Sequence, residues 1–454
     1  MRTLIRNGAI VTCDSHHSVI HGDILIENGT IVSTGVAPRS GSSGRRQKGA
    51  PREDGITRVI DATGCAILPG FVQAHIHLCQ TLFRGWAEDM PLLDWLRRRI
   101  WPLEAAHTPK SLAASADLGL LEMMLAGTTT ILDMGTVFHH DAVMTSILRS
   151  GIRAFSGKAM MDQGLGVPKN LLETRQESLR ESERLIKRWH RHPSGRIHYA
   201  FAPRFILSCS EGLLRDTAKM AEEHHCIVHT HAAEQVAERK AVREILGMDD
   251  IEALRTYGIA GERAVFAHGV QLTAREMKEL AREKTRIVHC PSSNLKLGSG
   301  IASLEALDRA GVRVALGADG APCNNNLDPW REMRLAAQLS KVKGSIDGIS
   351  AVRALRLATI DGARALGIGD LVGSLEVGKR ADLQIVELER VHQTPGGDLA
   401  TKLVHATSAA EVRDVCVDGV WVVRGRQHLM LDHEETLHRA KREAPSLWKR
   451  ADVT

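Results

Sequence analysis

A compact apolar stretch followed by a longer helical stretch recurs along the middle of the chain. Such stretches occur at residues 66–72, 128–132, 152–156, 197–201, 226–228, 264–267, 286–288 and 313–316. This alternation is typical of parallel strands joined by helical crossovers. Eight such units over about 300 residues predict an α/β fold, a closed (β/α)₈ TIM-like barrel. The alternative is a doubly wound open sheet, which normally has a glycine-rich turn after its first strand, whereas residues 73–77 read Gln-Ala-His-Ile-His.

The two ends of the chain have a different pattern. Short β-rich pieces separated by turns occupy residues 3–33 and occur again over 373–423. We therefore expect a small β-sandwich domain built from both chain ends, residues 1–64 and 373–428, beside a barrel domain at 65–372. Residues 429–454 predict a C-terminal amphipathic helix. Residues 37–55 are rich in glycine, serine and basic side chains without periodicity, and predict a mobile surface loop or insertion.

Composition excludes several classes of protein. The 454 residues are 43% hydrophobic and 25% charged, which is typical of globular chains and not of disordered or fibrous ones. A net charge of +5 and an aromatic content of 4% do not indicate a nucleic-acid partner. The eight cysteines form no C-x-x-C pair, which argues against a disulfide framework and fits a cytoplasmic location. Neither a signal peptide nor a membrane-spanning run is evident, so we expect no membrane partner.

Polar side chains follow the expected barrel strands at the point where each strand ends. In chain order they are His75 and His77, Asp133, Lys158, Arg204, His229 with His231 and Glu234, His268, His289, and Asp319. In a barrel of this kind the carboxyl ends of the strands meet at one face, where active sites are built. The sequence therefore predicts that these residues form one pocket.

Four of these residues have the chemistry of a metal site. His75 and His77 alternate along an extended segment and so face the same side. Together with His231 and Asp319 they make a set of three imidazoles and one carboxylate, which suits zinc or ferrous iron. We expect one divalent metal, zinc in preference to iron, with an open position for a water whose pKa it lowers from about 15.7 to about 7. His229 competes with His231, but His231 is nearer the mouth, and His229 is expected to be a core histidine.

Two further residues are candidates for catalysis. Glu234 follows His231 by three residues, close enough to stand beside the water as a proton shuttle. The alternative is a solvated glutamate of the following helix. His268 is the second candidate, able to polarise the water or to steady a tetrahedral adduct. The G-x-x-x-x-G-K pattern at 373–379 is interpreted as a β-turn, because Arg380 stands where a phosphate-binding loop needs Ser or Thr.

Taken together, the motifs resemble the amidohydrolase superfamily, in particular its aminohydrolases acting on purines, adenosine-type nucleosides and triazines. The segments that carry the resemblance are 68–77, 81–85, 127–130, 231–234, 268–269, 289–297, 317–320 and 373–382. The resemblance implies a single metal held by His75, His77, His231 and Asp319, with Glu234 as proton shuttle and His268 beside the water. It also implies hydrolytic loss of ammonia from an aromatic ring carbon. Residues 197–210 contain no lysine, so the two-metal centre bridged by a carboxylated lysine is not implied.

The resemblance points to two kinds of substrate. Gln80, Lys158 and Arg204 resemble guanine deaminases, in which a glutamine and an arginine read the base. Trp95, Glu104 and the segment 319–326 are similar to deaminases of S-adenosylhomocysteine, methylthioadenosine and 5′-deoxyadenosine. There the tryptophan packs on the substrate and the glutamate holds ribose hydroxyls.

Lys158 stands where the homocysteine-nucleoside enzymes have an arginine, which favours smaller 5′-modified adenosines. It is a candidate substrate contact or a structural ion-pair partner. We therefore expect a deaminase of adenosine-type nucleosides, with a small purine or nucleoside as its partner and a homo-oligomer as its assembly. The alternatives are guanine deamination, hydrolysis or dechlorination of triazines or other N-heterocycles, and a metal-storing barrel without catalysis.

Overall fold

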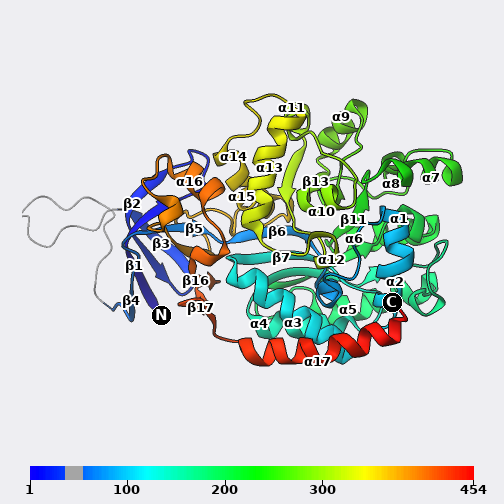
Figure 1. Cartoon of the computed structure of the whole chain (residues 1–454), viewed down its shortest axis with the longest axis horizontal. Helices are drawn as coiled ribbons and strands as arrows, with labels where there is room; N and C mark the ends of the chain where they lie inside the picture. Colours follow the sequence, from blue (N-terminus) through cyan, green and yellow to red (C-terminus); the bar gives the residue numbers. More distant parts are fainter. Residues whose placement is uncertain (36–54, 454) are drawn as a thin grey trace, which may run out of the picture.

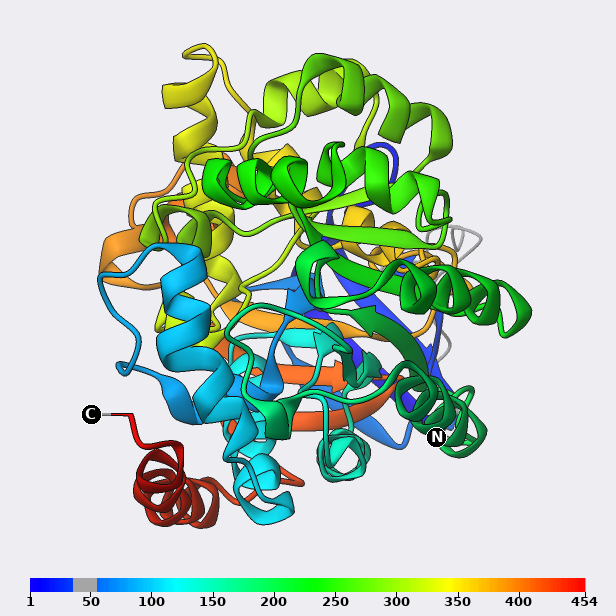
Figure 2. The same ribbon diagram turned by 90° about the vertical axis from the view of Figure 1, so that its right-hand side faces the viewer.

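The computed structural model describes residues 1–35 and 55–453, so the loop expected at 37–55 lies outside the described residues except for Gly55. The described residues form two large β-sheets. A barrel surrounded by helices makes up most of the molecule, and a smaller sheet lies at one end of it (Figure 1). Figure 2 looks onto the barrel from the end opposite the small sheet.

The barrel strands pair in chain order, and every pair is parallel. They are β6 (Phe71–Ile76), β7 (Thr128–Met134), β8 (Arg153–Gly157), β10 (Ile197–Pro203), β11 (Ile227–Ala232), β12 (Ala264–His268), β13 (Arg286–His289) and β14 (Arg313–Leu316). The short β9 (Ala159–Met160) pairs with β10. A parallel bridge between Ile76 and Asp319 brings the last strand back to the first. The predicted (β/α)₈ barrel is therefore confirmed as a nearly closed one.

Helices cover the outside of the barrel and follow its strands. The longer ones are α3 (Pro109–Leu125), α4 (His140–Ser150), α5 (Arg175–Trp189), α6 (Glu211–Glu223), α7 (Val236–Leu246), α9 (Ala274–Glu283) and α13 (Pro329–Lys343). The shorter ones are α8 (Asp250–Thr256), α10 (Pro291–Lys296), α11 (Leu304–Ala310), α12 (Ala321–Asn324), α14 (Ala351–Leu357), α15 (Ile360–Ala365) and α16 (Leu399–Ala406). Threonines with capping boxes begin α3, α5 and α9, which satisfies backbone N–H groups that the first turn leaves free.

The inside of the barrel is a packed apolar core. Each of the eight main strands contributes a side chain to one buried cluster, which includes Val72, Leu132, Phe155, Ala200, Ile227, Val265, Val288 and Ala315. Ala363 and Ala365 of α15 belong to the same cluster and close its amino-terminal end. Apolar side chains therefore fill the interior of the barrel, and the polar residues lie at its two ends.

The small sheet combines strands from both ends of the chain. Its order is β18 (Gln427–His428), β17 (Val420–Arg424), β16 (Val412–Val417), β15 (Leu383–Glu387), β5 (Cys65–Pro69), β1 (Arg2–Val11), β2 (Val19–Glu27) and β3 (Thr30–Gly35), with β4 (Arg58–Asp61) also on β1. Ile24 of β2 shares a buried cluster with Trp421 of β17, so the sheet folds over on itself as in a sandwich. The second, small β unit made from both chain ends is confirmed.

The strand expected at 66–72 is in fact two strands in different sheets. Residues 65–69 are β5 of the small sheet, and residues 71–76 are β6 of the barrel. Gly70 lies between them, where a Cβ atom would come within 2.1 Å of the Thr129 side chain. A continuous buried run does not reveal a change of sheet, which explains the difference. The division into domains at residue 65 remains a prediction, and residues 65–69, which it assigns to the barrel, pair in the small sheet.

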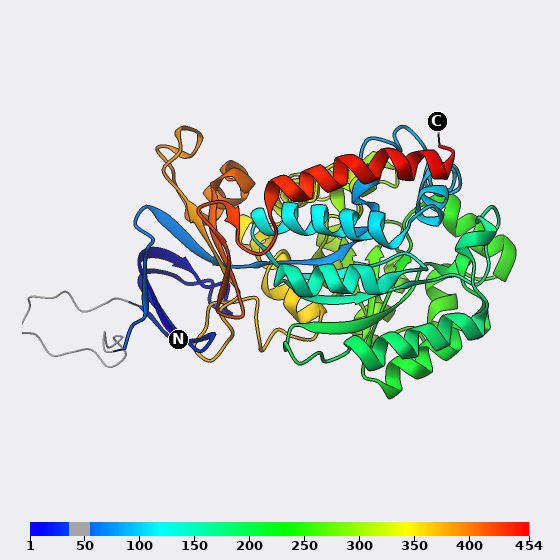
Figure 3. The same ribbon diagram turned by 90° about the horizontal axis from the view of Figure 1, so that it is seen from below.

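The last helix, α17 (His433–Ala451), runs along the outside of α3, within the range expected for a C-terminal helix (Figure 3). The rings of Trp448 and Trp86 are 4.5 Å apart, and the Trp448 Nε1–H donates to the Leu82 carbonyl over 2.9 Å. Within residues 1–35 and 55–453, none of the helices combines the length and apolarity needed to cross a membrane.

Truncating Leu447 is expected to destabilise the protein strongly. This side chain is fully buried in a cluster that also contains Phe83, Trp95 and Leu96. We expect Leu447→Ala to lower the free energy of unfolding by about 2–5 kcal/mol, because it leaves a cavity. Denaturant unfolding measures the effect, and Leu429→Ala is the control, since Leu429 is exposed. Equal losses in the two variants would contradict the packing assigned to α17.

Candidate metal centre and active site

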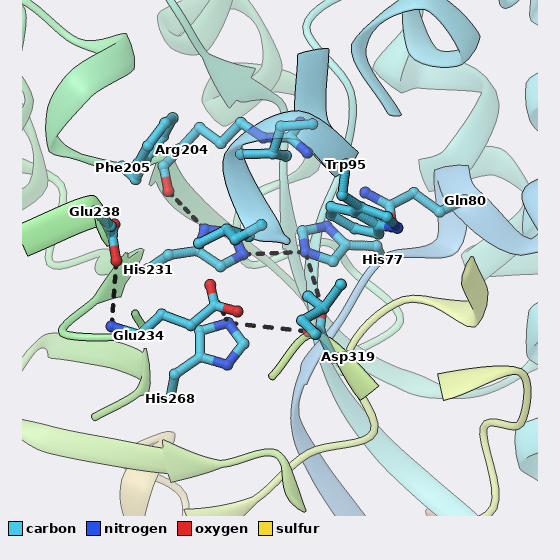
Figure 4. A pocket seen from close by; sticks show the side chains of 13 residues that line it. His77, Gln80, Trp95, Arg204, Phe205, His231, Glu234, Glu238, His268 and Asp319 are labelled. Carbon is cyan, nitrogen blue, oxygen red and sulfur yellow. Dashed lines mark hydrogen bonds and ion pairs between the residues drawn. The ribbon is translucent and has the colours of Figure 1, made fainter. Parts of the chain in front are cut away.

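The four expected metal ligands meet at the carboxyl ends of the barrel strands. One ligand atom from each of His75, His77, His231 and Asp319 lies within 4.8 Å of the others. The Nε2 atoms of His77 and His231 are 3.2 Å apart, and Asp319 Oδ1 lies 3.4 Å from Nε2 of His77 (Figure 4). The same Asp319 oxygen lies 3.2 Å from Nε2 of His75. Three different strand ends therefore supply one cluster of donors.

The backbone at the end of β14 is shaped to bring Asp319 to the histidines. A Cβ at Gly317 would lie 2.7 Å from the His75 carbonyl oxygen, so only glycine permits this close approach. The Asp319 N–H then donates to the same carbonyl over 3.0 Å. Asp319 and His268 both have left-handed backbone conformations, with φ of 60° and 78°. A left-handed backbone conformation is energetically unfavourable for residues other than glycine, and such residues cluster at functional sites.

The protonation of the histidines shows that a cation fits between them. The Nδ1–H of His77 donates to the Met134 carbonyl over 2.8 Å, and that of His231 donates to the Arg204 carbonyl over 2.6 Å. These bonds leave both Nε2 atoms as lone-pair acceptors that face each other. Burial lowers the pKa of His77 to about 3 and that of His231 well below its usual value, so both rings are neutral. Facing lone pairs repel, whereas a divalent metal satisfies them and the carboxylate together.

His229 lies behind this cluster. Its Nε2 is 2.7 Å from Nδ1 of His75, on the side of that ring away from Asp319. His229 is fully buried and does not belong to the group of potential ligands that His231 joins. The geometry thus supports His231 over His229 as the ligand from β11.

Glu234 and His268 lie together beside the four donors. Glu234 Oε2 is 3.4 Å from Nε2 of His268, and the hydroxyl of Ser299 donates to Oε1 over 3.2 Å. The Nδ1–H of His268 donates to Oδ1 of Asn294 over 2.9 Å, which fixes the ring. Burial raises the pKa of Glu234 above its usual value. Since Glu234 is buried, the alternative reading as a solvated helix residue is wrong.

A small cavity of about 30 Å³ lies over these groups, with Glu234, His268 and Asp319 among its lining residues. Three of the expected substrate contacts, Gln80, Trp95 and Arg204, also line it. Trp95 ends α1 (Leu92–Trp95), which continues through residues 96–100 into α2 (Trp101–Ala105). This helical segment lies at the end of the barrel seen in Figure 2. The free volume holds about one or two waters, so a larger substrate requires the residues that line the cavity to rearrange.

Glu104 lies behind the cavity wall. Its carboxylate accepts hydrogen bonds from Gln80 Nε2 over 2.9 Å and from Arg204 Nη1 over 2.5 Å. All three side chains are buried, and the carboxylate compensates the charge of the arginine. Glu104 therefore positions Gln80 and Arg204 in this structure instead of facing the cavity itself.

Lys158 does not join the other expected contacts. Its ammonium is fully buried, forms an ion pair with Glu173 and donates to the Ala159 carbonyl over 3.1 Å. It is not among the residues that line the cavity. This position does not support a substrate contact and agrees with the other interpretation, a structural ion pair.

The sequence assigned no role to four residues at the site: Glu238, Ser293, Asn294 and Ser299, which donates to Glu234. Glu238 lines the cavity, and its Oε2 accepts from the backbone N–H groups of Glu234 and Gln235. Its position three residues after Gln235 is a capping pattern that could have revealed it. Ser293 donates to Asp319 Oδ2 over 2.6 Å, and Asn294 holds His268. Both lie in the segment 289–297, which carries the family resemblance, but the sequence alone does not show which side chains they contact.

Comparison with known proteins agrees with this geometry. The model of the amidohydrolase family matches residues 66–422. A 5-methylthioadenosine/S-adenosylhomocysteine deaminase from Thermococcus kodakarensis is 37% identical, over 92% of this chain and 93% of its own length. The crystal structure of a zinc-bound adenosine deaminase from Xanthomonas campestris superposes with a TM-score of 0.89 at 31% identity, over 98% of each chain. Guanine deaminase from E. coli superposes with a TM-score of 0.83 at 28% identity, over 93% of this chain and 99% of its own.

Proposed function

Because the chain belongs to the amidohydrolase family and is a metal-dependent hydrolase acting on C–N bonds, we propose that it deaminates the adenine ring of 5′-modified adenosines. The proposed substrates are methylthioadenosine, S-adenosylhomocysteine and 5′-deoxyadenosine. The observation that carries the proposal is the buried Glu234 carboxylate against His268, directly beside the His₃Asp cluster. A metal-storing barrel has no need of a buried carboxyl group there, because Glu234 is not one of the four donors.

The metal is proposed to be zinc. Its ligands would be His75, His77, His231 and Asp319, a donor set that suits zinc in four-coordinate sites. The similar adenosine deaminase structure from Xanthomonas campestris contains zinc, which supports the choice over iron. When bound, such a metal supplies Lewis acidity that makes hydroxide available from water near neutral pH.

The side chains around it carry out the proton transfers. Glu234 takes a proton from the attacking water and delivers it to the ring nitrogen next to C6 of adenine. His268, held by Asn294, orients the water and steadies the tetrahedral adduct. As the adduct collapses, Glu234 transfers the proton of the new C6 hydroxyl to the amino group, the C6–N bond breaks and ammonia leaves. The carbon keeps the oxygen, so adenine becomes hypoxanthine.

Two observations bear on substrate choice. The relative from Thermococcus kodakarensis bears the name of a 5-methylthioadenosine/S-adenosylhomocysteine deaminase, which supports a nucleoside with a 5′ substituent. Gln80 and Arg204 both face the cavity, as the resemblance to guanine deaminases implies. Guanine deamination is therefore the second candidate. Trp95 is proposed to pack on the substrate, and Glu104 to reach ribose hydroxyls once the 92–105 segment moves.

A panel of substrates tests the proposal. We expect the zinc-loaded enzyme to release ammonia from methylthioadenosine, 5′-deoxyadenosine or S-adenosylhomocysteine with a kcat/KM at least tenfold above that for guanine. Ultraviolet absorbance follows the conversion of adenine to hypoxanthine directly. Guanine turning over faster than every nucleoside would reject the proposed substrate class and favour the second candidate.

A further inference from the structure

A second cavity lies at the amino-terminal end of the barrel, opposite the metal centre. Its volume is about 680 Å³, within the range of small-molecule sites. The first residues of β13 and β14, Arg286 and Arg313, line it together with residues of α14 and α15 and the loop after α15. Five arginines but only three aspartates line this cavity, so it is positively charged.

Three of the five arginines form ion pairs with two aspartates of the cavity wall, which leaves one of their three charges uncompensated. Arg353 pairs with Asp308 over 2.7 Å and also with Asp361. Arg356 and Arg364 contact Asp361 over 3.2 Å and 3.5 Å. These contacts occupy two of the three aspartates, and the third, Asp370, is exposed to solvent.

The other two arginines lack such partners. Arg286 and Arg313 are paired in register on neighbouring parallel strands, so their positive charges lie side by side. Across residues 1–35 and 55–453, no carboxylate oxygen is within 4.0 Å of either guanidinium. Arg286 is only 6% exposed, and its Nε–H is buried without a hydrogen-bond partner. Glu262 attracts Arg286 electrostatically, but its carboxylate is bound to Lys284 over 2.6 Å.

The alternation of side chains directs both arginines toward the barrel axis. Arg286 is two residues before Val288, and Arg313 is two residues before Ala315, and both apolar residues belong to the cluster inside the barrel. Burial and the neighbouring Arg313 lower the pKa of Arg286 to about 10, so it is still charged at neutral pH. A buried, unpaired cation is destabilising unless an anion compensates it.

We propose that Arg286 and Arg313 bind the phosphoryl group of a small phosphate-bearing metabolite at the base of the barrel. A phosphoryl group carries close to two negative charges, which match the two free guanidinium groups, and its oxygens accept the bidentate hydrogen bonds that arginine donates. The rest of the 680 Å³ accommodates the organic part of the ligand. Because this end of a barrel is remote from the catalytic face, binding is expected to change stability and not turnover.

Thermal unfolding of the zinc-loaded full chain tests the proposal without using activity. Melts are recorded in chloride buffer and, at equal ionic strength, with 10 mM inorganic phosphate or 10 mM ribose 5-phosphate, a monophosphate ester without a base for the catalytic site. Wild type is compared with Arg286→Met, Arg313→Met and the control Arg275→Met, whose arginine is exposed on α9. Isothermal titration calorimetry supplies the Kd of each phosphate compound.

The expected result has two parts. Phosphate compounds raise the Tm of wild type and of Arg275→Met, but this shift is lost and the Kd rises about tenfold or more in both site variants. In chloride alone, Arg286→Met melts at or above the wild-type temperature, because it removes an uncompensated buried charge. If Arg286→Met fails to fold, the exposed Arg313 still provides the comparison.

The two probes distinguish the source of the phosphoryl group. Tighter binding of the monophosphate supports an organic phosphate ester as ligand, and equal binding supports free phosphate. A Tm shift equal in wild type and both site variants, or no shift in wild type, would overturn the proposal. Neither result depends on which base the catalytic site deaminates.

Discussion

Glu234→Gln is expected to lower kcat for nucleoside deamination by about 10²- to 10⁴-fold, the usual contribution of a positioned general acid and base. Glutamine keeps the shape of the side chain and can still accept the hydrogen bond from Ser299. It cannot accept a proton from water and return it to the ring, so both the attack and the departure of ammonia slow. Ammonia release from methylthioadenosine, measured at saturating substrate, gives the loss.

Measuring the zinc content of Glu234→Gln distinguishes loss of proton transfer from loss of the metal. Glu234 is not one of the four potential ligands, so Glu234→Gln should retain one zinc per chain. Glu262→Gln is the matched control, because Glu262 is exposed and pairs with Lys284 at the surface. If Glu234→Gln keeps its zinc and releases ammonia at the wild-type rate from every purine tested, the role assigned to Glu234 is wrong.

Asp319→Asn is expected to remove both the metal and the activity. The amide has no negative charge to compensate a dication beside three neutral imidazoles, so zinc binding should weaken by orders of magnitude and kcat should fall below detection. Metal analysis after dialysis measures the zinc retained, and Asp94→Asn on the exposed side of α1 serves as the control. Chelation of wild type should abolish activity as well, and added zinc should restore it.

Circular dichroism distinguishes loss of the metal from misfolding of the Asp319→Asn variant. The Asp319 N–H bond to the His75 carbonyl involves the backbone alone, so the barrel should still close in the variant. We therefore expect circular dichroism of Asp319→Asn to match that of chelated wild type. Full zinc content with wild-type turnover in Asp319→Asn would show that the metal lies elsewhere.

The sequence allowed the barrel and the cluster of potential metal ligands to be predicted because both depend on local patterns. His75, His77, His231 and Asp319 each follow an apolar strand, and parallel strands in a barrel bring such positions to one face. The preference for His231 over His229 rested on distance from the mouth, and the structure places them accordingly.

What could not be predicted depends on long-range packing. The sheet change at Gly70 occurs inside one apolar run, since both strands are buried on both faces. Lys158 follows its strand as the other candidates do, but its long side chain reaches Glu173 instead of the cavity. Glu104 was expected at the substrate and lies one layer behind it, because its partners Gln80 and Arg204 are supplied by segments distant in sequence.

The strands of the small sheet come from both ends of the chain, so the sheet can be completed only late in synthesis. β1, β2 and β5 leave the ribosome first, whereas β15, which pairs with β5, is synthesised only after the whole barrel. Until then β5 has an unpaired edge of the kind that invites aggregation. Slowing translation should therefore prolong the lifetime of this vulnerable intermediate, and chaperones that shield exposed strand edges should raise the yield of native enzyme.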